Sequence, residues 1–344
     1  MSRETTRIVT PWPEPPEDGT AREVAEGVLW VRLALPMALD HVNAYALDDG
    51  DGWTLLDPGL HDARTVGHWE ALLAGPLAGR PVWRVVVTHH HPDHIGMAGW
   101  FQRRGAELWT TRTAYVTARM LVLDEQESWP DETVAHYRGA GMDAAVLAER
   151  LAQRPFNFAD SVAPLRLGYR RLVEGERVRL GGRDWDVRMG DGHAPEHATF
   201  WSRDDDLVLG GDQLLGSITP NIGVYPTEPL ADPLAEWIAA CRRLAPHARA
   251  DQLVLPGHRL PFRGLPDRLA QFEAHHERAL ARLHAHLAEP RTAAECFPPL
   301  FRRRIGAGEY GLALGEALAH CHRLWYAGRA TRERRGDAWV FAAR

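Results

Sequence analysis

The feature that most constrains this chain is the largely apolar run Val82–Val87, which leads directly into Thr88-His89-His90-His91-Pro92-Asp93-His94. A short valine-rich run of this kind predicts a buried strand. An extended start to the following loop would place His89 and His91 on the same side, because side chains alternate along a strand. The next turn would then present Asp93 and His94 in another direction. These side chains therefore predict half of a site for two adjacent metal ions.

Three later strand ends also place a histidine or an aspartate next to glycine. They are Gly192-His193, Gly211-Asp212 and Gly257-His258, and each follows an apolar run. Glycine lets the backbone approach a site closely because it has no Cβ. Imidazole and carboxylate are ligands that zinc accepts. We therefore expect the remaining metal ligands at these three junctions.

The pattern of strands and helices changes along the chain. Strand patterns dominate between about residues 28 and 255, and a helical segment rich in aromatic residues interrupts them at about 111–160. From Pro266 the pattern is helical, and it ends in two short strand-like runs around residues 334–337. Thr292-Ala-Ala-Glu295 predicts a capping box at the start of a short helix there. We expect one domain over 20–262, carrying the helical insertion, and a small winged-helix domain over 266–344.

The ordered motifs, with Asp57-Pro58-Gly59 ahead of them, resemble the metallo-β-lactamase superfamily over about residues 28–262. The resemblance implies an α/β fold of the αββα type, in which two mixed sheets are flanked by helices. It also implies a ligand set. A first metal would be held by His89, His91 and His193, a second by Asp93, His94 and His258, and Asp212 would bridge the two.

The resemblance also gives roles to two residues outside the ligand set. Asp57 resembles the early aspartate of the family, which supports the metal loop without binding metal. His197 resembles the second histidine of glyoxalase II-like members, and we expect it to support the site. His91 stands where the flavo-diiron branch has a glutamate, so the pattern is that of the hydrolases. In one small departure, Gly-Asp-Gly-His193 replaces the Thr-Pro-Gly-His of many members.

Such a centre predicts hydrolysis without a serine or cysteine nucleophile. Two Zn²⁺ ions can share a water, lower its pKa toward about 7 and so generate a metal-bound hydroxide. We expect Asp93 to be the catalytic residue that orients this hydroxide and accepts its proton. Iron or manganese would fit the same ligands, so the spacing does not determine the metal. The chain has no lysine, which excludes a Schiff-base mechanism.

The segment after Pro266 resembles the beta-lactamase-like protein 2 group, which includes an endoribonuclease and many bacterial hydrolases. One hypothesis is therefore a hydrolase of a small carboxyl ester, thioester or lactone. It is supported by the net charge of −12 over 1–258, by the insertion, which would narrow the entrance, and by the glyoxalase-like His193–His197 pair. A β-lactamase and an iron-dependent thiol dioxygenase are weaker alternatives.

The rival hypothesis is a phosphodiesterase acting on RNA. Residues 259–344 contain 15 arginines against 9 acidic residues, and a winged helix can face nucleic acid. The arginine clusters Arg302–Arg304 and Arg332–Arg335 could contact the phosphates of RNA. However, the expected recognition helix, Leu312 to Tyr326, carries only Arg323 as a cation, together with Glu316. A small-molecule substrate is therefore favoured over nucleic acid, and the C-terminal domain is expected to be structural or to form a homodimer.

The sequence also bears on the cellular compartment. No apolar run approaches the roughly 18 residues that a membrane span requires. The first residues, Met1 to Thr5, form no apolar signal segment. We therefore expect a cytoplasmic protein that does not bind membranes.

Overall fold

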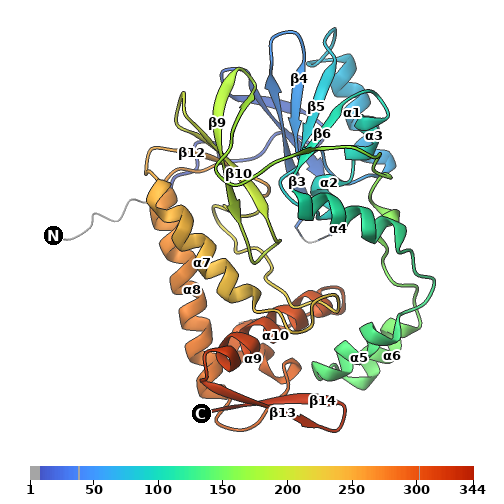
Figure 1. The fold of residues 1–344 in the computed structure, drawn as a ribbon, viewed down its shortest axis with the longest axis vertical. Coiled ribbons are helices and arrows are strands. Elements are labelled where there is room, and N and C mark those ends of the chain that lie inside the picture. Colours follow the sequence, from blue (N-terminus) through green and yellow to red (C-terminus); the bar gives the residue numbers. More distant parts are fainter. Residues whose placement is uncertain (1–7, 38, 302) are drawn as a thin grey trace, which may run out of the picture. The chain divides into compact units, whose positions relative to one another are not determined.

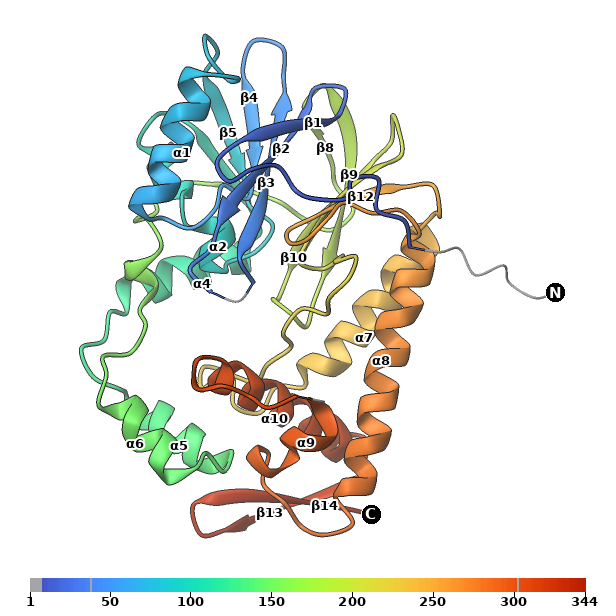
Figure 2. The ribbon, with the colours of Figure 1, turned by 180° about the vertical axis from the view of Figure 1, so that it is seen from behind.

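The structure is a computed structural model that describes residues 8–37, 39–301 and 303–344. These residues form two compact units. The sandwich unit consists of the described residues within 1–125, 157–220 and 244–269. The helical unit consists of those within 126–156, 221–243 and 270–344. Figures 1 and 2 show the elements of both units from opposite sides.

The sandwich unit contains two mixed sheets. The first has the order β1-β2-β3-β4-β5-β6-β7, antiparallel from β1 to β4 and parallel from β4 to β7. Its strands are β1 (Ala21–Ala25), β2 (Val28–Ala34), β3 (His41–Asp48), β4 (Trp53–Leu56), β5 (Val82–Val86), β6 (Glu107–Thr110) and β7 (Arg170–Arg171). The second has the order β12-β11-β10-β9-β8, in which only β11 and β12 are parallel. Its strands are β8 (Arg177–Leu180), β9 (Arg183–Gly190), β10 (His197–Ser202), β11 (Leu207–Gly211) and β12 (Leu253–Pro256).

Strand alternation divides the apolar residues of this unit between two cores. In β5, Val85 faces the same core as Val87, whereas Val86 faces the other. The first core lies between the seven-stranded sheet and its flanking helices, and it includes Trp69 of α1 (Ala63–Ala74) and Phe101 of α3 (Ala98–Gln102). The second core lies between the two sheets. Central strands buried on both faces explain why their sequences are continuously apolar.

This architecture confirms the predicted fold class of two mixed sheets flanked by helices. The strands β1, β6 and β7 were not predicted. Two of them carry charged, half-buried or exposed residues at the sheet margin, such as Arg22 and Arg171, so the apolar signal used to find strands is weak there. No helix in the described part of the chain combines the length and the apolar character that crossing a bilayer requires.

The helical unit joins part of the insertion to the C-terminal segment. Its elements are α5 (Asp131–Gly139), α6 (Ala144–Leu151), α7 (Pro233–Leu244), α8 (Leu265–His286), α9 (Phe297–Leu300), α10 (Tyr310–Tyr326), β13 (Ala330–Arg335) and β14 (Ala338–Ala343), with α7 and α8 each running past the boundary of the unit. The insertion contacts the segment after α8 directly, because Ala294 N–H donates to the carbonyl of Ala140 at 3.1 Å. The capping box is present, since Thr292 and Glu295 exchange side-chain to backbone hydrogen bonds.

The remaining helices of the sandwich unit follow β5 and β6 along the chain. They are α2 (Pro92–Ile95) and α4 (Arg112–Leu123), the first helix of the predicted insertion. Thr111 begins α4, and its hydroxyl accepts a hydrogen bond from Ala114 N–H. The structure thus groups α4 with the sandwich unit and α5 and α6 with the helical unit. The domain boundaries and the winged-helix character of the C-terminal segment stay predictions.

Candidate metal centre

The histidine-rich loop follows β5 and ends in the single turn of α2. His91 occupies the N-cap position of this turn in an extended conformation, and Pro92 takes the first helical position. Proline is suited to that position because its fixed φ angle is compatible with a helix and its missing N–H is not needed there. Asp93 and His94 follow within the turn. The chain therefore changes direction between His91 and Asp93, as the sequence predicts.

The other candidate side chains also follow strands of the sandwich unit. His193 comes after β9, Asp212 directly after β11, and His258 two residues after β12. Strands β11 and β12 are parallel and pair Gly211 with Pro256. Their carboxyl ends therefore lie at the same edge of the sheet, which brings Asp212 and His258 together.

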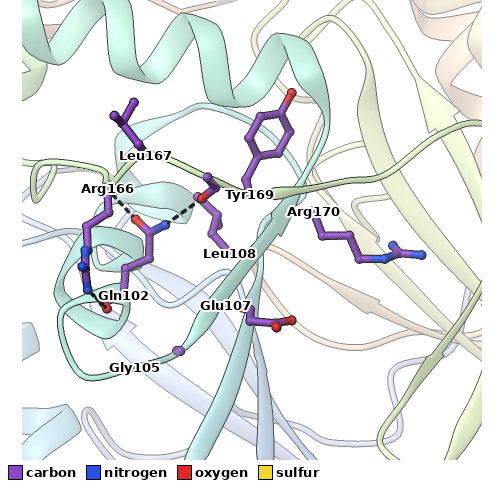
Figure 3. Close-up of a pocket in the computed structure, with 10 residues that line it drawn as sticks. Gln102, Gly105, Glu107, Leu108, Arg166, Leu167, Tyr169 and Arg170 are labelled. Atoms are coloured by element: carbon purple, nitrogen blue, oxygen red, sulfur yellow. Dashed lines mark hydrogen bonds between the residues drawn. The ribbon is translucent and has the colours of Figure 1, made fainter.

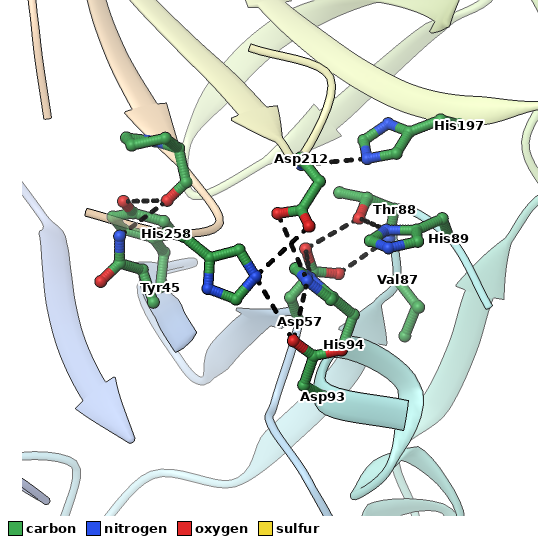
Figure 4. Close-up of polar contacts among 12 residues, drawn as sticks. Tyr45, Asp57, Val87, Thr88, His89, Asp93, His94, His197, Asp212 and His258 are labelled. Atoms are coloured by element: carbon green, nitrogen blue, oxygen red, sulfur yellow. Dashed lines mark hydrogen bonds and ion pairs between the residues drawn. The ribbon is translucent and has the colours of Figure 1, made fainter. Parts of the chain in front are cut away.

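Within the described residues, three overlapping groups of side chains place their ligand atoms within 4.8 Å of one another. The groups are His89, His91 and His193; His89, His94 and Asp212; and Asp93, His94 and His258. The first and third groups are the two sets predicted from the sequence, and the second group connects them through Asp212. Figure 4 shows Asp212 among the rings from the β5–α2 loop and His258.

Asp212 lies close to histidines of both predicted sets. Its Oδ2 is 3.4 Å from His193 Nε2 and 3.3 Å from His258 Nε2, and its Oδ1 is 3.4 Å from His94 Nε2. The same Nε2 atom of His258 also lies 3.3 Å from Asp93 Oδ2. One carboxylate thus faces histidines of both sets.

Several ligand atoms are buried and lack a hydrogen-bond partner. Among the described residues these atoms include Nε2 of His89 and His94 and Oδ1 of Asp212. Buried polar atoms normally have partners, because an unpaired one costs free energy. Here the unpaired atoms converge on one another, and imidazole and carboxylate match the ligands of divalent transition metals. The residues present therefore fit a divalent metal site.

Asp57 holds the β5–α2 loop and the ring of His94 in place through hydrogen bonds. Its carboxylate, 1% exposed, accepts hydrogen bonds from the backbone and the hydroxyl of Thr88, both at 2.8 Å. The same carboxylate lies 2.9 Å from Nδ1 of His94. A proton on Nδ1 leaves Nε2 of that ring free to face the centre. Asp57 adopts a φ of 49°, an uncommon conformation for a residue other than glycine.

His197 lies behind the centre. Its ring stacks on His89 at 4.6 Å, and its Nε2 accepts a hydrogen bond from the backbone N–H of Asp212. Accepting this bond requires a neutral ring, and burial does lower the pKa of His197 to about 3. His197 therefore contacts two candidate ligands, and the supporting role expected for it stays a prediction.

The sequence did not reveal three groups that position the candidate ligands. The Thr88 hydroxyl lies 2.9 Å from Nδ1 of His89. The backbone carbonyl of His41 lies 2.7 Å from Nδ1 of His258. Asn43 donates hydrogen bonds to the carbonyls of Pro256 and Arg259, on either side of that histidine. Only Thr88 carries a sequence signal, since it stands between the strand and the first histidine, whereas the others come from a distant strand.

Burial and charge divide the histidines of the centre into two classes. Burial lowers the pKa of His89 and His91 well below the usual value, and neighbouring imidazoles lower it further. Burial also disfavours charge on His94 and His258, but the nearby carboxylates, with Asp212 foremost, outweigh it. They raise the pKa of His94 well above its usual value and that of His258 to about 10. A metal ion would replace the protons on these two rings.

Two glycines make room for this arrangement. A Cβ on Gly257 would lie 2.3 Å from Oδ1 of Asp212 and 2.7 Å from Cε1 of His94. A Cβ on Gly211 would lie 2.6 Å from the ring of His197, and its φ of 47° also favours glycine. The glycines that precede candidate ligands therefore permit close approach, as expected.

His90 is not part of the ligand groups. Its ring stacks on Phe158 at 6.4 Å, and it belongs to none of the three groups. The open hollow of about 550 Å³ beside α3 and β6 is also separate from the centre, as its lining residues include no candidate ligand (Figure 3). There, Gln102 accepts a hydrogen bond from Arg166 N–H and so braces the segment before β7.

Comparisons with known proteins agree with this geometry. Residues 37–258 match the model of the metallo-beta-lactamase superfamily, and residues 280–344 match that of a metallo-beta-lactamase-like C-terminal domain. A probable metallo-hydrolase from Bacillus subtilis (strain 168), YqjP, is 27% identical over 249 residues, which cover 69% of this chain and 73% of that one.

Two solved structures are similar over nearly the whole chain. A beta-lactamase domain protein from Burkholderia ambifaria is 36% identical with a TM-score of 0.90, and the match covers 98% of each chain. A metallo-beta-lactamase family protein from Thermus thermophilus, TTHA1429, is 26% identical with a TM-score of 0.78, covering 94% of this chain and all of the other. Together with the site geometry, these matches show that the chain belongs to the metallo-beta-lactamase superfamily and is a metal-dependent hydrolase with a His/Asp divalent metal site.

Proposed function

We propose that this metallo-hydrolase cleaves a small carboxyl ester, thioester or lactone with two metal ions, zinc by preference. His89, His91 and His193 would hold one ion, Asp93, His94 and His258 the other, and Asp212 both. The observation that carries the two-ion proposal is the convergence of buried ligand atoms in two sets joined by one carboxylate, with Nε2 of His89 and His94 and Oδ1 of Asp212 lacking hydrogen-bond partners. When bound, such ions lower the pKa of a water molecule toward about 7 and polarise a scissile carbonyl.

Asp93 is the residue of this centre best suited to move a proton. Its side chain is 18% exposed, whereas those of Asp212 and Asp57 are 7% and 1% exposed. Burial opposes its ionisation, but His94 and His258 outweigh this and hold the pKa of Asp93 below the usual value. It is therefore ionised at neutral pH. It can orient an attacking water, accept its proton and return that proton to the leaving group.

The remaining residues of the centre orient the ligands. The carboxylate of Asp57 and the backbone carbonyl of His41 each face Nδ1 of a histidine, so the Nε2 atoms of His94 and His258 stay directed at the centre. Thr88 contributes in the same way to His89. These contacts hold the catalytic geometry before substrate arrives, which reduces the cost of organising it during the reaction.

The surroundings of the C-terminal arginines favour a small substrate over RNA. Arg323 of α10 is paired with Asp232 at 2.6 Å, and Arg303 with Glu309 at 2.5 Å. Arg332 lies over the rings of Trp325 and Trp339. Nucleic-acid binding depends on arrayed cations that are free to contact phosphates. Arg302, which the sequence also suggested, lies outside the described residues. The homodimer expected through this segment stays a prediction, which light scattering after size-exclusion chromatography tests.

A substrate panel tests the proposed reaction. The metal-loaded enzyme is assayed for kcat/KM on a chromogenic acetate ester, a thioester, a lactone, a phosphodiester and a cephalosporin, with Asp212→Asn as a control for contaminating hydrolases. We expect the carboxyl derivatives to be the best substrates and elemental analysis to find two zinc ions per chain. Preferential cleavage of the phosphodiester or RNA, with salt-dependent retention on heparin, would overturn the proposal.

A further inference from the structure

The helical unit contains a cavity of about 200 Å³ that is separate from the metal-site residues. It is lined by residues of α5, α6 and α10 and of the segments before α7 and α10: His136, Tyr137, Arg150, Val224, Tyr225, Pro226, Gly308, Gly311, Leu312, Leu314 and Gly315. Each water molecule occupies about 30 Å³ of liquid, so the cavity has the volume of about seven waters, which is room for a small organic ligand. The cavity combines an apolar wall, formed by Val224 and Leu314, with one cation.

That cation is Arg150 of α6. Its guanidinium lies 5.6 Å from the ring of Tyr137 and 5.8 Å from the ring of Trp129. In the part of the chain that the structure describes, no carboxylate lies within 4.0 Å of it. Gly311 of α10 makes room for the guanidinium, because a Cβ there would lie 3.2 Å from one terminal nitrogen and 3.3 Å from the other. Arg150 is thus held between aromatic rings with donors left for a ligand.

The other polar groups of the cavity carry no negative charge that would compete for this cation. Burial raises the pKa of Tyr225 to about 12 and that of Tyr137 above its usual value, so both phenols are neutral. Burial lowers the pKa of His136, so its ring is neutral at pH 7. Two acids adjoin lining residues in sequence. Glu309 pairs with Arg303 at 2.5 Å. Glu316 accepts a hydrogen bond from Asn221 at 3.0 Å, and burial raises the pKa of Glu316 to about 7.

We propose that this cavity binds a small organic monocarboxylate, with its carboxylate on Arg150 and its flat apolar body between Tyr137, Tyr225 and the wall formed by Val224 and Leu314. An arginine presents paired donors that match the two oxygens of a carboxylate. A phosphate dianion fits less well, because the cavity offers one cation and a neutral histidine. The proposal depends only on the geometry of the helical unit and not on the reaction at the metal centre.

Calorimetric titration of the full-length, metal-loaded protein with benzoate tests the proposal. A bound metal also attracts carboxylates. The test is therefore the difference in benzoate affinity between the variants and the wild type, all loaded with the same metal. We expect Arg150→Gln to weaken benzoate binding at least about tenfold, the loss typical of one charge-assisted interaction. Arg138→Gln, which removes an exposed cation from the neighbouring helix α5, should leave it unchanged. Benzamide, which has the same shape without the charge, should bind at least tenfold more weakly than benzoate.

A second pair of variants keeps the charge of Arg150 and adds a methyl group at a glycine. Gly311→Ala should shift the guanidinium and weaken benzoate binding, whereas Gly306→Ala, whose Cβ meets open space, should not. Thermal denaturation of each variant verifies that it is folded. Equal benzoate affinity in the Arg150→Gln variant and the wild type, equal affinity for benzamide and benzoate, or tighter binding of inorganic phosphate than of benzoate would overturn the proposal.

Discussion

Replacing Asp57 by asparagine should weaken the metal centre without touching a metal ligand. The carboxylate accepts hydrogen bonds from Thr88 N–H at Oδ1 and from the Thr88 hydroxyl at Oδ2, and Oδ2 also faces Nδ1 of His94. Asparagine has the same shape and keeps one oxygen, which can still accept the backbone N–H. Its amide nitrogen takes the place of Oδ2. Two N–H donors then face the Thr88 hydroxyl and Nδ1 of His94. The proton of His94 is therefore favoured on Nε2, the nitrogen that must be free to bind metal.

The structure sets the magnitude of the effect. Each hydrogen bond to a charged group contributes about 1.5–3 kcal/mol, so two lost bonds set an upper limit of about 3–6 kcal/mol. That loss is divided between folding and metal binding, and replacement of a residue that supports a ligand typically reduces metal affinity about 10- to 100-fold. We therefore expect a loss of about 1.4–2.7 kcal/mol in metal binding, together with a lower free energy of unfolding.

Competition with a chromogenic chelator measures the two metal affinities of the reconstituted protein. In Asp57→Asn the ion held by the Asp93, His94 and His258 group should be the more weakened. Thr88→Val, which removes the hydroxyl beside His89, should also weaken the ion held by the other group. Asp62→Asn is a matched control, because Asp62 caps α1 and asparagine caps helices equally well. Wild-type affinity for both ions in Asp57→Asn would refute the positioning role of the carboxylate.

Three further predictions concern catalysis, pH and packing. Asp93→Asn should reduce turnover per bound metal at least about 100-fold, in line with the usual contribution of a general base, and wild-type turnover would contradict its role. Glu316 has its pKa raised from 4.5 to about 7 by burial, so the folded state binds a proton that the unfolded state releases, and stability should fall as the pH rises from about 4.5 to 7. Glu316→Gln should remove that decline and be more stable by about 1–3 kcal/mol at pH 8 in urea titrations, whereas an unchanged pH profile would argue against the raised pKa. Gly257→Ala should displace Asp212 and lower metal content, while Gly67→Ala, whose Cβ meets open space on α1, should keep full metal content; full content in both variants would show that the loop adapts.

The sequence alone determined the family and the identity of the candidate ligands. A valine-rich strand leading into closely spaced His and Asp residues leaves few alternatives, because strand geometry fixes which side chains share a side. Glycines before His193, Asp212 and His258 marked the other contributors, and the structure places all of them together. These features are local, so each can be recognised without knowing the distant parts of the chain.

Tertiary structure alone decided how the ligands are held and what surrounds the cation in the helical unit. The His41 carbonyl and Asn43 support the His258 loop from a strand more than 200 residues earlier, a separation that no local pattern encodes. The cavity around Arg150 likewise needs α6 and α10 to meet, with Gly311 opposite the guanidinium. Metal ligation depends on residue types at short spacing, which the sequence records directly. The hydrogen bonds that hold the ligands and the shape of the cavity depend on long-range packing, which only the folded chain creates.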